Sequence, residues 1–354
     1  MVTVAYRYII KELIIVLGTV FVLLMLVSIA ARFTGYLQEA AAGKFTADVL
    51  WTLMSLRLPE FVQLALPFSL VIAVIVTFGR LHADQEFVVM VMGGTSILRL
   101  VGWLCSIVVP VAILVGVLSL VVTPAARQGF VNLLANIAVS HEFDLVRPGE
   151  FRSFSNDTRT IYVDEVDRDA RVLHGVFLFE ERDTSDVTVL ADSATFLIDS
   201  DTGHRLLRLH EGVRYEGSPG KADYEIVSFE ELSLRLDLSE ELDIPIEVEA
   251  LPSASLDRSI GEHAQQLDWR ISLPIMTFVS GLLAFALSRT RPRSGRFGQI
   301  IPGVLAFVCY YLLLVLVQQV LSDSSELSTA ILYTCHLLVF VAAATLIHRQ
   351  LNPR

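Results

Sequence analysis

The stretch FVQLALPFSLVIAVIVTFGRLHADQEFVVMVMGGTS, residues 61–96, joins a long apolar run to a short mixed one. Residues 61–78 contain no Asp, Glu, Lys or Arg, and about 20 such residues cross the roughly 30 Å hydrocarbon core of a bilayer. After a charged turn, only six apolar residues, 87–92, precede a double glycine. Six residues are too few to cross a bilayer, so the stretch predicts a membrane span followed by a short helix before the next span.

Similar apolar windows recur along the chain, which has 354 residues and is 53% hydrophobic. Its mean hydropathy of +0.59 is well above that of an ordinary soluble protein. The uncharged apolar windows are residues 13–31, 61–78, 100–122, 271–287, 300–317 and 330–347. The sequence therefore predicts an α-helical membrane protein with six transmembrane helices, arranged as three before and three after a long insert.

The charged residues indicate the orientation of these spans. Of the 38 acidic residues, 28 lie in residues 141–260, and the rest of the chain is net positive. Basic residues occupy the short segments that would share one side of the membrane: Arg7, Lys11, Arg80, Arg99, Arg289, Arg291, Arg293, Arg296, Arg349 and Arg354. By the positive-inside rule that side is cytoplasmic. Both termini are then predicted to be cytoplasmic and the acidic insert external.

The first span has an alternative interpretation as a cleaved signal peptide. It follows a basic start, and Ser28–Ile29–Ala30 loosely resembles a cleavage site. The length of the apolar stretch and the orientation of the five later spans favour a retained helix.

The insert, residues 123–268, is predicted to be an antiparallel β domain. The segments TIYVDEV, GVFLFEE, ATFLIDSDTGHRLLRLHEGVRYEG and YEIVSFEELSLRLDL alternate apolar and polar residues, and DSDTG provides a hairpin turn. One parity carries apolar side chains and the other polar ones, and the simplest role of the apolar face is an ordinary core. The apolar set is Leu207, Leu209, Val213 and Tyr215.

Catalytic and metal-binding motifs are not expected. The stretch AAGKFT resembles a phosphate-binding loop, but Gln38 stands where its first glycine belongs and Phe45 replaces the Ser or Thr after the lysine. The histidines are scattered, the closest pair being His204 and His210, and no cofactor is predicted. The cysteines, Cys105, Cys309 and Cys335, all fall in predicted spans, which makes them packing residues rather than disulfide partners.

The order of three spans, external β domain and three spans resembles the lipopolysaccharide export permeases LptF and LptG along almost the whole chain. Residues 57–96 resemble the second span and following helix of that family, with Pro59, Pro67, Glu86 and Gly94 in place. LDWRISLPI and RPRSGR resemble the two ends of its fourth span. LVRPGEF, VLADSATFLI and LRLHEGVRYEG resemble the F-type β domain, which the family builds as an open jelly roll. Gln266 and Gly35 depart from the family pattern, which is often acidic at the first position and basic at the second.

The resemblance implies a domain plan and a set of partners. Residues 1–122 would hold the first three spans and a coupling helix at about 80–94, residues 123–268 the periplasmic jelly roll, and residues 269–354 the last three spans. The partners would be a G-type permease, a dimeric cytoplasmic ATPase like LptB, a single-span periplasmic partner like LptC and a periplasmic bridge like LptA. ATP hydrolysis would then belong to a separate subunit.

The resemblance also implies that the short helix inserts into a groove on the ATPase. A carboxylate, an apolar face at helical spacing and a glycine that reverses the chain fit such a contact. The residues are Glu86, Phe87, Val88, Val91, Met92 and Gly94. The alternative is a helix that lies among the lipid headgroups, with Glu86 only favouring its first turn.

The substrate implied is lipopolysaccharide, which would enter between the first and fifth spans from the periplasmic leaflet. Each buried CH₂ holds a lipid in the bilayer by ~0.8 kcal/mol, so several acyl chains must pass from one apolar surface to another. Arg32 and, as a weaker candidate, Gln318 would line the headgroup cavity, and a guanidinium suits lipid phosphates. Snorkelling is the ordinary alternative for Arg32.

Two other classes stay open at this stage. A lipoprotein-releasing permease of another ABC exporter would be expected to have four spans, with its large domain after the first. A membrane sensor would use the β domain only to bind a partner. Co-purification with an ATPase and a second permease distinguishes transport from sensing.

Overall fold

The protein is described by a computed structural model. It covers residues 2–41, 47–145, 148–154, 159–167, 170, 172–181, 186–198, 205–218, 224–235, 248–289, 300–320 and 325–351. The chain divides into two compact units, Met1–Gly129 with Val248–Arg354, and Phe130–Glu247. Most of the AAGKFT motif, His204 and the whole of RPRSGR lie outside the described residues.

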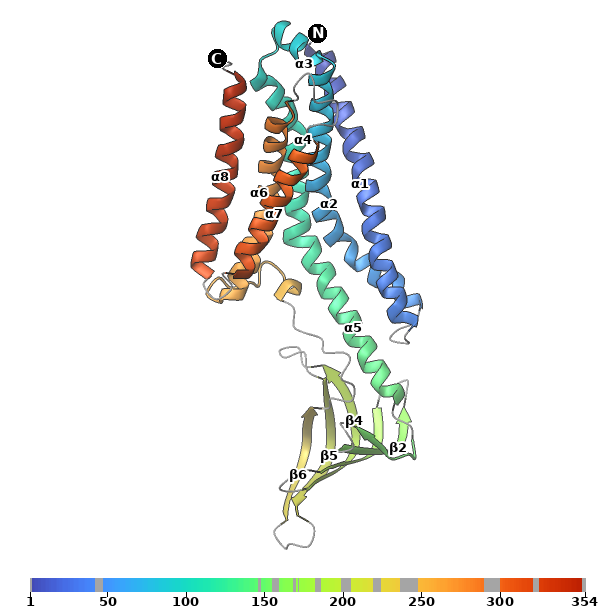
Figure 1. Ribbon diagram of the computed structural model, residues 1–354. Helices are drawn as coiled ribbons and strands as arrows, with labels where there is room; N and C mark the ends of the chain where they lie inside the picture. Colours follow the sequence, from blue (N-terminus) through green and yellow to red (C-terminus); the bar gives the residue numbers. More distant parts are fainter. Residues whose placement is uncertain are drawn as a thin grey trace. The chain divides into compact units, whose positions relative to one another are not determined.

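The first unit is helical (Figure 1). Its elements are α1 (Val2–Ala41), α2 (Ala47–Ala83), α3 (Glu86–Met92), α4 (Ile97–Val117), the π-helix η1 (Leu118–Val122), the start of α5 (Thr123–Leu145), the 3₁₀ turn η2 (Val248–Ala250), α6 (Gly261–Leu287), α7 (Ile300–Val320) and α8 (Ser325–Leu351). The chain leaves this unit within α5, between residues 129 and 130, and returns at η2, between residues 247 and 248.

Within the described residues, six helical segments are long and apolar enough to span a membrane, which confirms the predicted fold class. They are Val4–Gln38, Val49–Ala83, Ile97–Leu134, Gly261–Leu287, Ile300–Val320 and Ser328–Gln350. Each contains one of the predicted windows. The helices extend beyond the apolar windows because polar residues at their ends keep the same backbone hydrogen bonding outside the hydrocarbon.

Two central helices hold the bundle together. The apolar windows of α2 and α6 are mostly buried, and the rings of Phe78 and Phe285 meet edge to face with centroids 4.8 Å apart. A Cβ on Gly303 of α7 would lie 2.2 Å from Cδ1 of Ile75, so a larger residue would require the end of the Ile75 side chain to move. By contrast, few residues of α1 are buried along its apolar window, where the side chains are half-buried or exposed, and α1 packs mainly against α2. Its apolar surface is therefore available to lipid or to another membrane subunit.

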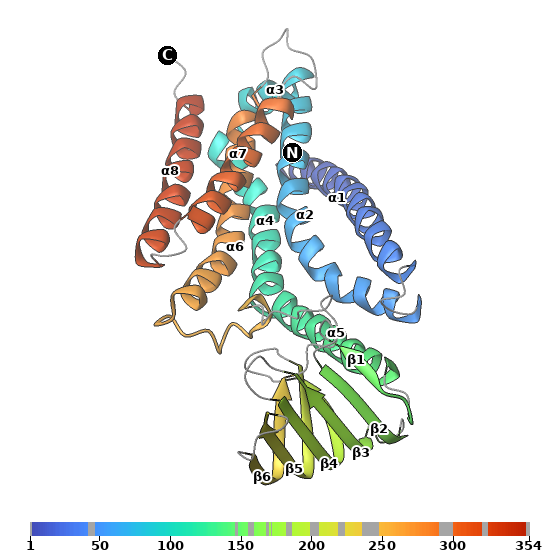
Figure 2. The ribbon, with the colours of Figure 1, turned by 60° about the horizontal axis from the view of Figure 1, so that its bottom comes forward.

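The second unit contains a six-stranded antiparallel sheet, with strands side by side in the order of the sequence (Figure 2). The strands are β1 (Arg152–Phe154), β2 (Arg159–Asp167), β3 (Val172–Glu180), β4 (Asp186–Ile198), β5 (Arg205–Gly217) and β6 (Glu225–Arg235). The predicted antiparallel β domain is confirmed. The described strands form a simple meander, without the crossed connections that define a jelly roll.

One row of residues across the sheet, with one residue in each of the longer strands, is left out of the pairing between neighbouring strands. The residues left out of the ladders are Asp164, Gly175, Asp192, Glu211 and Glu230. Gly175 and Glu211 have φ of 62° and 48°, in the left-handed region that residues other than glycine seldom adopt. At this row the buried positions change parity, from Leu173 to Val176 on β3 and from Ala191 to Ala194 on β4. On these two strands, the side chains that face the core therefore switch between odd and even positions at this row.

This reversal corrects the expectation that four apolar residues of β5 share one face. Leu207 and Leu209 are fully buried and pair with Phe196 and Ala194. Beyond Glu211, Val213 pairs with the exposed Leu190, whereas the next residue, Arg214, pairs with the buried Val189. Val213 and Tyr215 thus lie on the other face, because the positive φ at Glu211 interrupts the period of two on which the prediction depended.

Candidate functional site

The short helix α3 is bounded by two reversals of the chain. Gln85 adopts a left-handed conformation, with φ of 62°, and turns the chain out of α2. Gly94 has φ of 89°, and the hydroxyl of Ser96 then accepts a hydrogen bond from the Arg99 amide to begin α4. These reversals limit α3 to seven residues, the short helix that the sequence predicts.

The side chains of α3 do not form a single exposed face. Phe87 is buried, and its ring stacks on His82 of α2 with centroids 4.0 Å apart. Val88, Val91 and Met92 are 45%, 37% and 83% exposed. Phe87 therefore anchors the helix to the bundle, and the other three present an apolar surface to a partner or to the bilayer.

This surface borders a groove at the same end of the bundle. The groove has a volume of about 250 Å³ and is mainly apolar. Its lining residues are His82, Phe87, Val88, Val91, Met92, Ile97, Arg289 and Gln350. An apolar depression with one arginine at its side fits the helix-in-groove type of contact between proteins.

Glu86 belongs to a group of polar residues from three helices, the α3 network, formed by Tyr8, Glu12, Arg80 and Glu86. The Tyr8 hydroxyl lies 3.1 and 3.4 Å from the two carboxylate oxygens of Glu86. Nη2 of Arg80 donates to that hydroxyl at 2.6 Å, and Nε of Arg80 lies 3.4 Å from a carboxylate oxygen of Glu12. In the described part of the chain, no Lys or Arg lies within ion-pair distance of Glu86, so its charge is open to an external cation.

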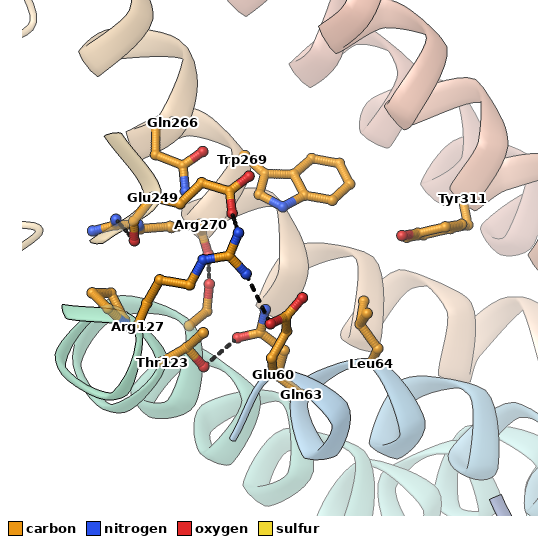
Figure 3. Close-up of a pocket in the computed structure, with 12 residues that line it drawn as sticks. Glu60, Gln63, Leu64, Thr123, Arg127, Glu249, Gln266, Trp269, Arg270 and Tyr311 are labelled. Atoms are coloured by element: carbon orange, nitrogen blue, oxygen red, sulfur yellow. Dashed lines mark hydrogen bonds and ion pairs between the residues drawn. The ribbon is translucent and has the colours of Figure 1, made fainter. Parts of the chain in front are cut away.

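A second group lies where the chain leaves and re-enters the helical unit. This insertion network consists of Glu60, Arg127, Glu249 and Arg270 (Figure 3). Nη1 of Arg127 lies 3.0 Å from the Glu60 carboxylate and Nη2 lies 2.6 Å from that of Glu249. Arg127 therefore links α2, α5 and the returning segment by two charge-assisted bonds. They surround a cavity of about 170 Å³.

Arg270 holds the returning segment from inside the bundle and is only 2% exposed. It donates to the Ser253 hydroxyl at 2.7 Å and to the backbone carbonyls of Glu249 and Val248 at 3.0 and 3.5 Å. Ser119 of η1 in turn donates to the Arg270 carbonyl at 2.9 Å. A buried guanidinium is tolerated when its donors find acceptors, and here those acceptors belong to the returning segment.

The predicted headgroup residues lie on two helices that both pack against α2. Arg32 of α1 is exposed, and within the described residues it has no ion-pair partner. Gln318 of α7 is half-buried; its side-chain nitrogen lies 3.5 Å from the Gln265 carbonyl, and the Gln265 side chain donates to the Gln318 carbonyl. Arg32 is thus free to meet a ligand, whereas Gln318 joins α7 to α6.

In the β unit, Val213 and Tyr215 line an open groove of about 590 Å³ together with Tyr162, Phe177 and Leu190. A hydrogen bond to the Asp164 carboxylate raises the pKa of the Tyr162 phenol. Leu207 and Leu209 belong instead to the closed core of this unit.

Sequence reasoning missed Tyr8, Glu60, Arg127 and Glu249. Their partners are far away in the chain, 78 residues in the Tyr8–Glu86 bond and 67 in the Arg127–Glu60 bond. A weak signal was available for Arg127, since it is a cation close to the predicted outer end of a span. Among the described residues, no group of three or more His, Cys, Asp or Glu could hold a metal ion.

Among the described residues, six apolar helices, an inserted antiparallel unit and a short partly exposed helix between two spans define a multi-pass membrane protein. A family model described as lipopolysaccharide export system permease LptF/LptG matches residues 7–349, and the chain therefore belongs to this family. The resemblance seen in the motifs is confirmed.

Curated relatives agree with the family. The lipopolysaccharide export system permease protein LptF of Escherichia coli K12 is 25% identical over 311 residues, which cover 87% of this chain and 84% of the relative. The LptF proteins of Escherichia coli O157:H7 and Shigella flexneri match with the same values. Family and fold together indicate a multi-pass protein of the inner membrane.

Proposed function

We propose that this permease is one subunit of an ABC transporter that extracts lipopolysaccharide from the periplasmic leaflet of the inner membrane and passes it to a periplasmic bridge. The observation that carries the proposal is α3, a short helix anchored by Phe87 that leaves three apolar side chains exposed. Its Glu86 carboxylate is half-buried and has no ion-pair partner among the described residues. A separate ATPase with a basic, apolar groove would complement this surface.

The orientation proposed follows from charge. The acidic insert lies outside and α3 lies inside with both termini, because Arg7, Lys11, Arg80, Arg99 and Arg289 belong to the α3 side of the bundle. An engineered cysteine at Ser218 should react with an impermeant thiol reagent in cells whose outer membrane alone is opened. Reaction only after opening of the inner membrane would reverse the orientation.

The lipid route proposed uses apolar surfaces throughout. The exposed apolar side of α1, which carries Arg32, would flank the entry together with α7, which carries Gln318. The guanidinium of Arg32 would bind a headgroup phosphate. Leu207 and Leu209 are candidates for an interior that receives acyl chains, and their complete burial means that the sheet must open to admit lipid.

The partners proposed are a G-type permease, a dimeric LptB-like ATPase, a single-span LptC-like protein and an LptA-like bridge. Their presence would explain the long exposed apolar face of α1, since a second permease can cover part of it.

Reconstitution tests the proposal. The chain is co-purified with a G-type permease, the ATPase and the single-span partner, placed in vesicles with lipopolysaccharide, and supplied with ATP and a soluble bridge protein. Lipid transfer to the bridge is expected only when ATP and all subunits are present. A stable complex that hydrolyses ATP without moving lipopolysaccharide would point to another lipid exporter, and failure to form a complex would point to a sensor.

A further inference from the structure

Tyr8 occupies a special place in the α3 network. It lies on α1, yet its hydroxyl touches both a cation of α2 and the carboxylate that begins α3. The guanidinium carbon of Arg80 also lies 5.6 Å from the centre of the Tyr8 ring. The Tyr8 side chain thus contacts side chains of α2 and of α3.

The order of these contacts determines what Glu86 can do. Arg80 donates to the Tyr8 oxygen, so the single phenolic proton is left to donate to Glu86. Arg80 is itself paired with Glu12 rather than with Glu86. A direct Arg80–Glu86 pair would neutralise the carboxylate, whereas a neutral phenol orients it and leaves most of its acceptor positions unoccupied.

An aromatic residue near the end of a span also has an ordinary explanation, because tyrosine rings favour the interface between lipid and water. That explanation requires the ring and a solvated hydroxyl. It does not require the hydroxyl to lie within hydrogen-bond distance of two charged groups from two other helices.

We propose that Tyr8 is a positioning residue for energy coupling: it orients the Glu86 carboxylate toward the basic partner and ties α1 to α3, so that movement of α3 is passed to α1. This inference rests on the proposed docking role of Glu86. It adds that α1, the helix proposed to flank the lipid entry, receives the movement through this hydroxyl and not only through its packing against α2.

The test removes the hydroxyl and keeps the ring. Tyr8→Phe deletes the bond to Glu86 but preserves the aromatic surface over Arg80. Tyr6→Phe is the matched control, since Tyr6 is on the same helix and its hydroxyl reaches only Ser106, at 3.2 Å, among the contacts described. Both variants, Glu86→Gln, and the double variant Tyr8→Phe/Glu86→Gln are reconstituted with the ATPase and the second permease.

The readout is the amount of lipopolysaccharide released per ATP hydrolysed, with the thermal unfolding midpoint of each complex as a check on folding. Tyr8→Phe should lower this ratio roughly 3- to 10-fold, as expected for one partly exposed hydrogen bond to a charged group. Tyr6→Phe should leave it unchanged. In the Glu86→Gln background the loss of the Tyr8 hydroxyl should have little further effect, because the charge that this hydroxyl orients is already absent.

The outcomes separate the two hypotheses. A wild-type ratio for Tyr8→Phe, an equal loss for Tyr6→Phe, or strictly additive losses in the double variant would overturn the positioning role. If Glu86→Gln itself behaves as wild type, the docking role proposed for Glu86 fails, and the inference about Tyr8 fails with it. A lowered unfolding midpoint for Tyr8→Phe with an unchanged ratio would assign the hydroxyl to stability alone, which also overturns the proposal.

Discussion

The two polar networks of the helical unit use similar residues in opposite ways. Glu60 and Arg80 are both on α2, 20 residues and so roughly 30 Å apart. In the insertion network, both carboxylates that meet Arg127 lie within 3.0 Å of it, and Arg270 is enclosed. In the α3 network, Glu86 is half-buried and, among the described residues, its carboxylate contacts a neutral hydroxyl rather than a cation. A network that satisfies its own charges stabilises a junction, whereas one that leaves a charge unpaired is suited to a partner.

The largest expected effect is at Arg270. Arg270→Ala leaves the buried carbonyls of Val248 and Glu249 without a donor and creates a cavity, at a cost of about 3–5 kcal/mol to the free energy of unfolding. The measurement is thermal unfolding in detergent. Arg258→Ala is the control, because that side chain is 62% exposed and its nearest approach to Asp268 is 3.7 Å. Equal shifts for the two variants would contradict a closed, stabilising junction.

The next effect is expected at Glu86, and it should appear in binding rather than in folding. Removing one partner of a charge pair that is buried on docking costs about 2–5 kcal/mol, because the other charge remains unpaired. Glu86→Ala should therefore reduce the ATPase subunit retained on purification and the release of lipid, and Glu86→Lys should reduce both further through repulsion.

Asp84→Ala is the matched control, since this exposed carboxylate lies two residues earlier. Its retention of the ATPase should stay near that of the wild type. Wild-type values for Glu86→Lys in both assays would mean that α3 only lies on the membrane, and the contrast between the networks would lose its functional meaning.

A smaller effect is expected for the bridge made by Arg127. Arg127→Ala and Glu249→Ala each break the same 2.6 Å ion pair, so their combined cost should be less than the sum, with a coupling of about 1 kcal/mol. Glu249 is 55% exposed, and screening by water limits the value. Strict additivity in thermal unfolding would show that this ion pair contributes nothing to the stability of the junction.

The smallest effect is expected at Arg32, a single exposed cation. Its contact with a lipid phosphate would be partly solvated, so Arg32→Gln should weaken photocrosslinking of lipopolysaccharide to α1 only about 2- to 5-fold. Arg32→Glu should weaken it more, because repulsion is added to the loss of a charge-assisted bond. Equal crosslinking in the wild type and both variants would show that Arg32 does not bind the lipid phosphate and only snorkels toward the headgroups.

Sequence reasoning succeeded for structural features whose physical cause lies within one short stretch of residues. The six spans follow from runs of uncharged apolar residues, and α3 follows from a run that is too short and ends in Gly93 and Gly94. The strands follow from alternation, and the family from local motifs. For Glu86, the sequence also indicated an acidic group at the start of α3, which is where the structure places it.

Other features depend on contacts between distant segments or on a single backbone angle. Phe87 was assigned to an outward face by helical spacing, but the position of α2 brings it onto His82 and buries it. Val213 and Tyr215 were assigned to the interior by parity, but the φ of 48° at Glu211 moves them to the other face. A prediction from periodicity assumes a regular backbone, so it fails where a single residue has an irregular backbone conformation.

By itself, then, the sequence determined the membrane class, the number of spans, the inserted β domain and the family, because hydrophobicity and alternation act within 20 residues or fewer. Only the tertiary structure decided which charges are satisfied. The Tyr8 hydroxyl meets Glu86 across 78 residues of chain, and Arg127 meets Glu249 across 122. Whether a charge is closed off by its own chain or left for a partner depends on such distant contacts, since pairing is set by distance in space and not by position in the sequence.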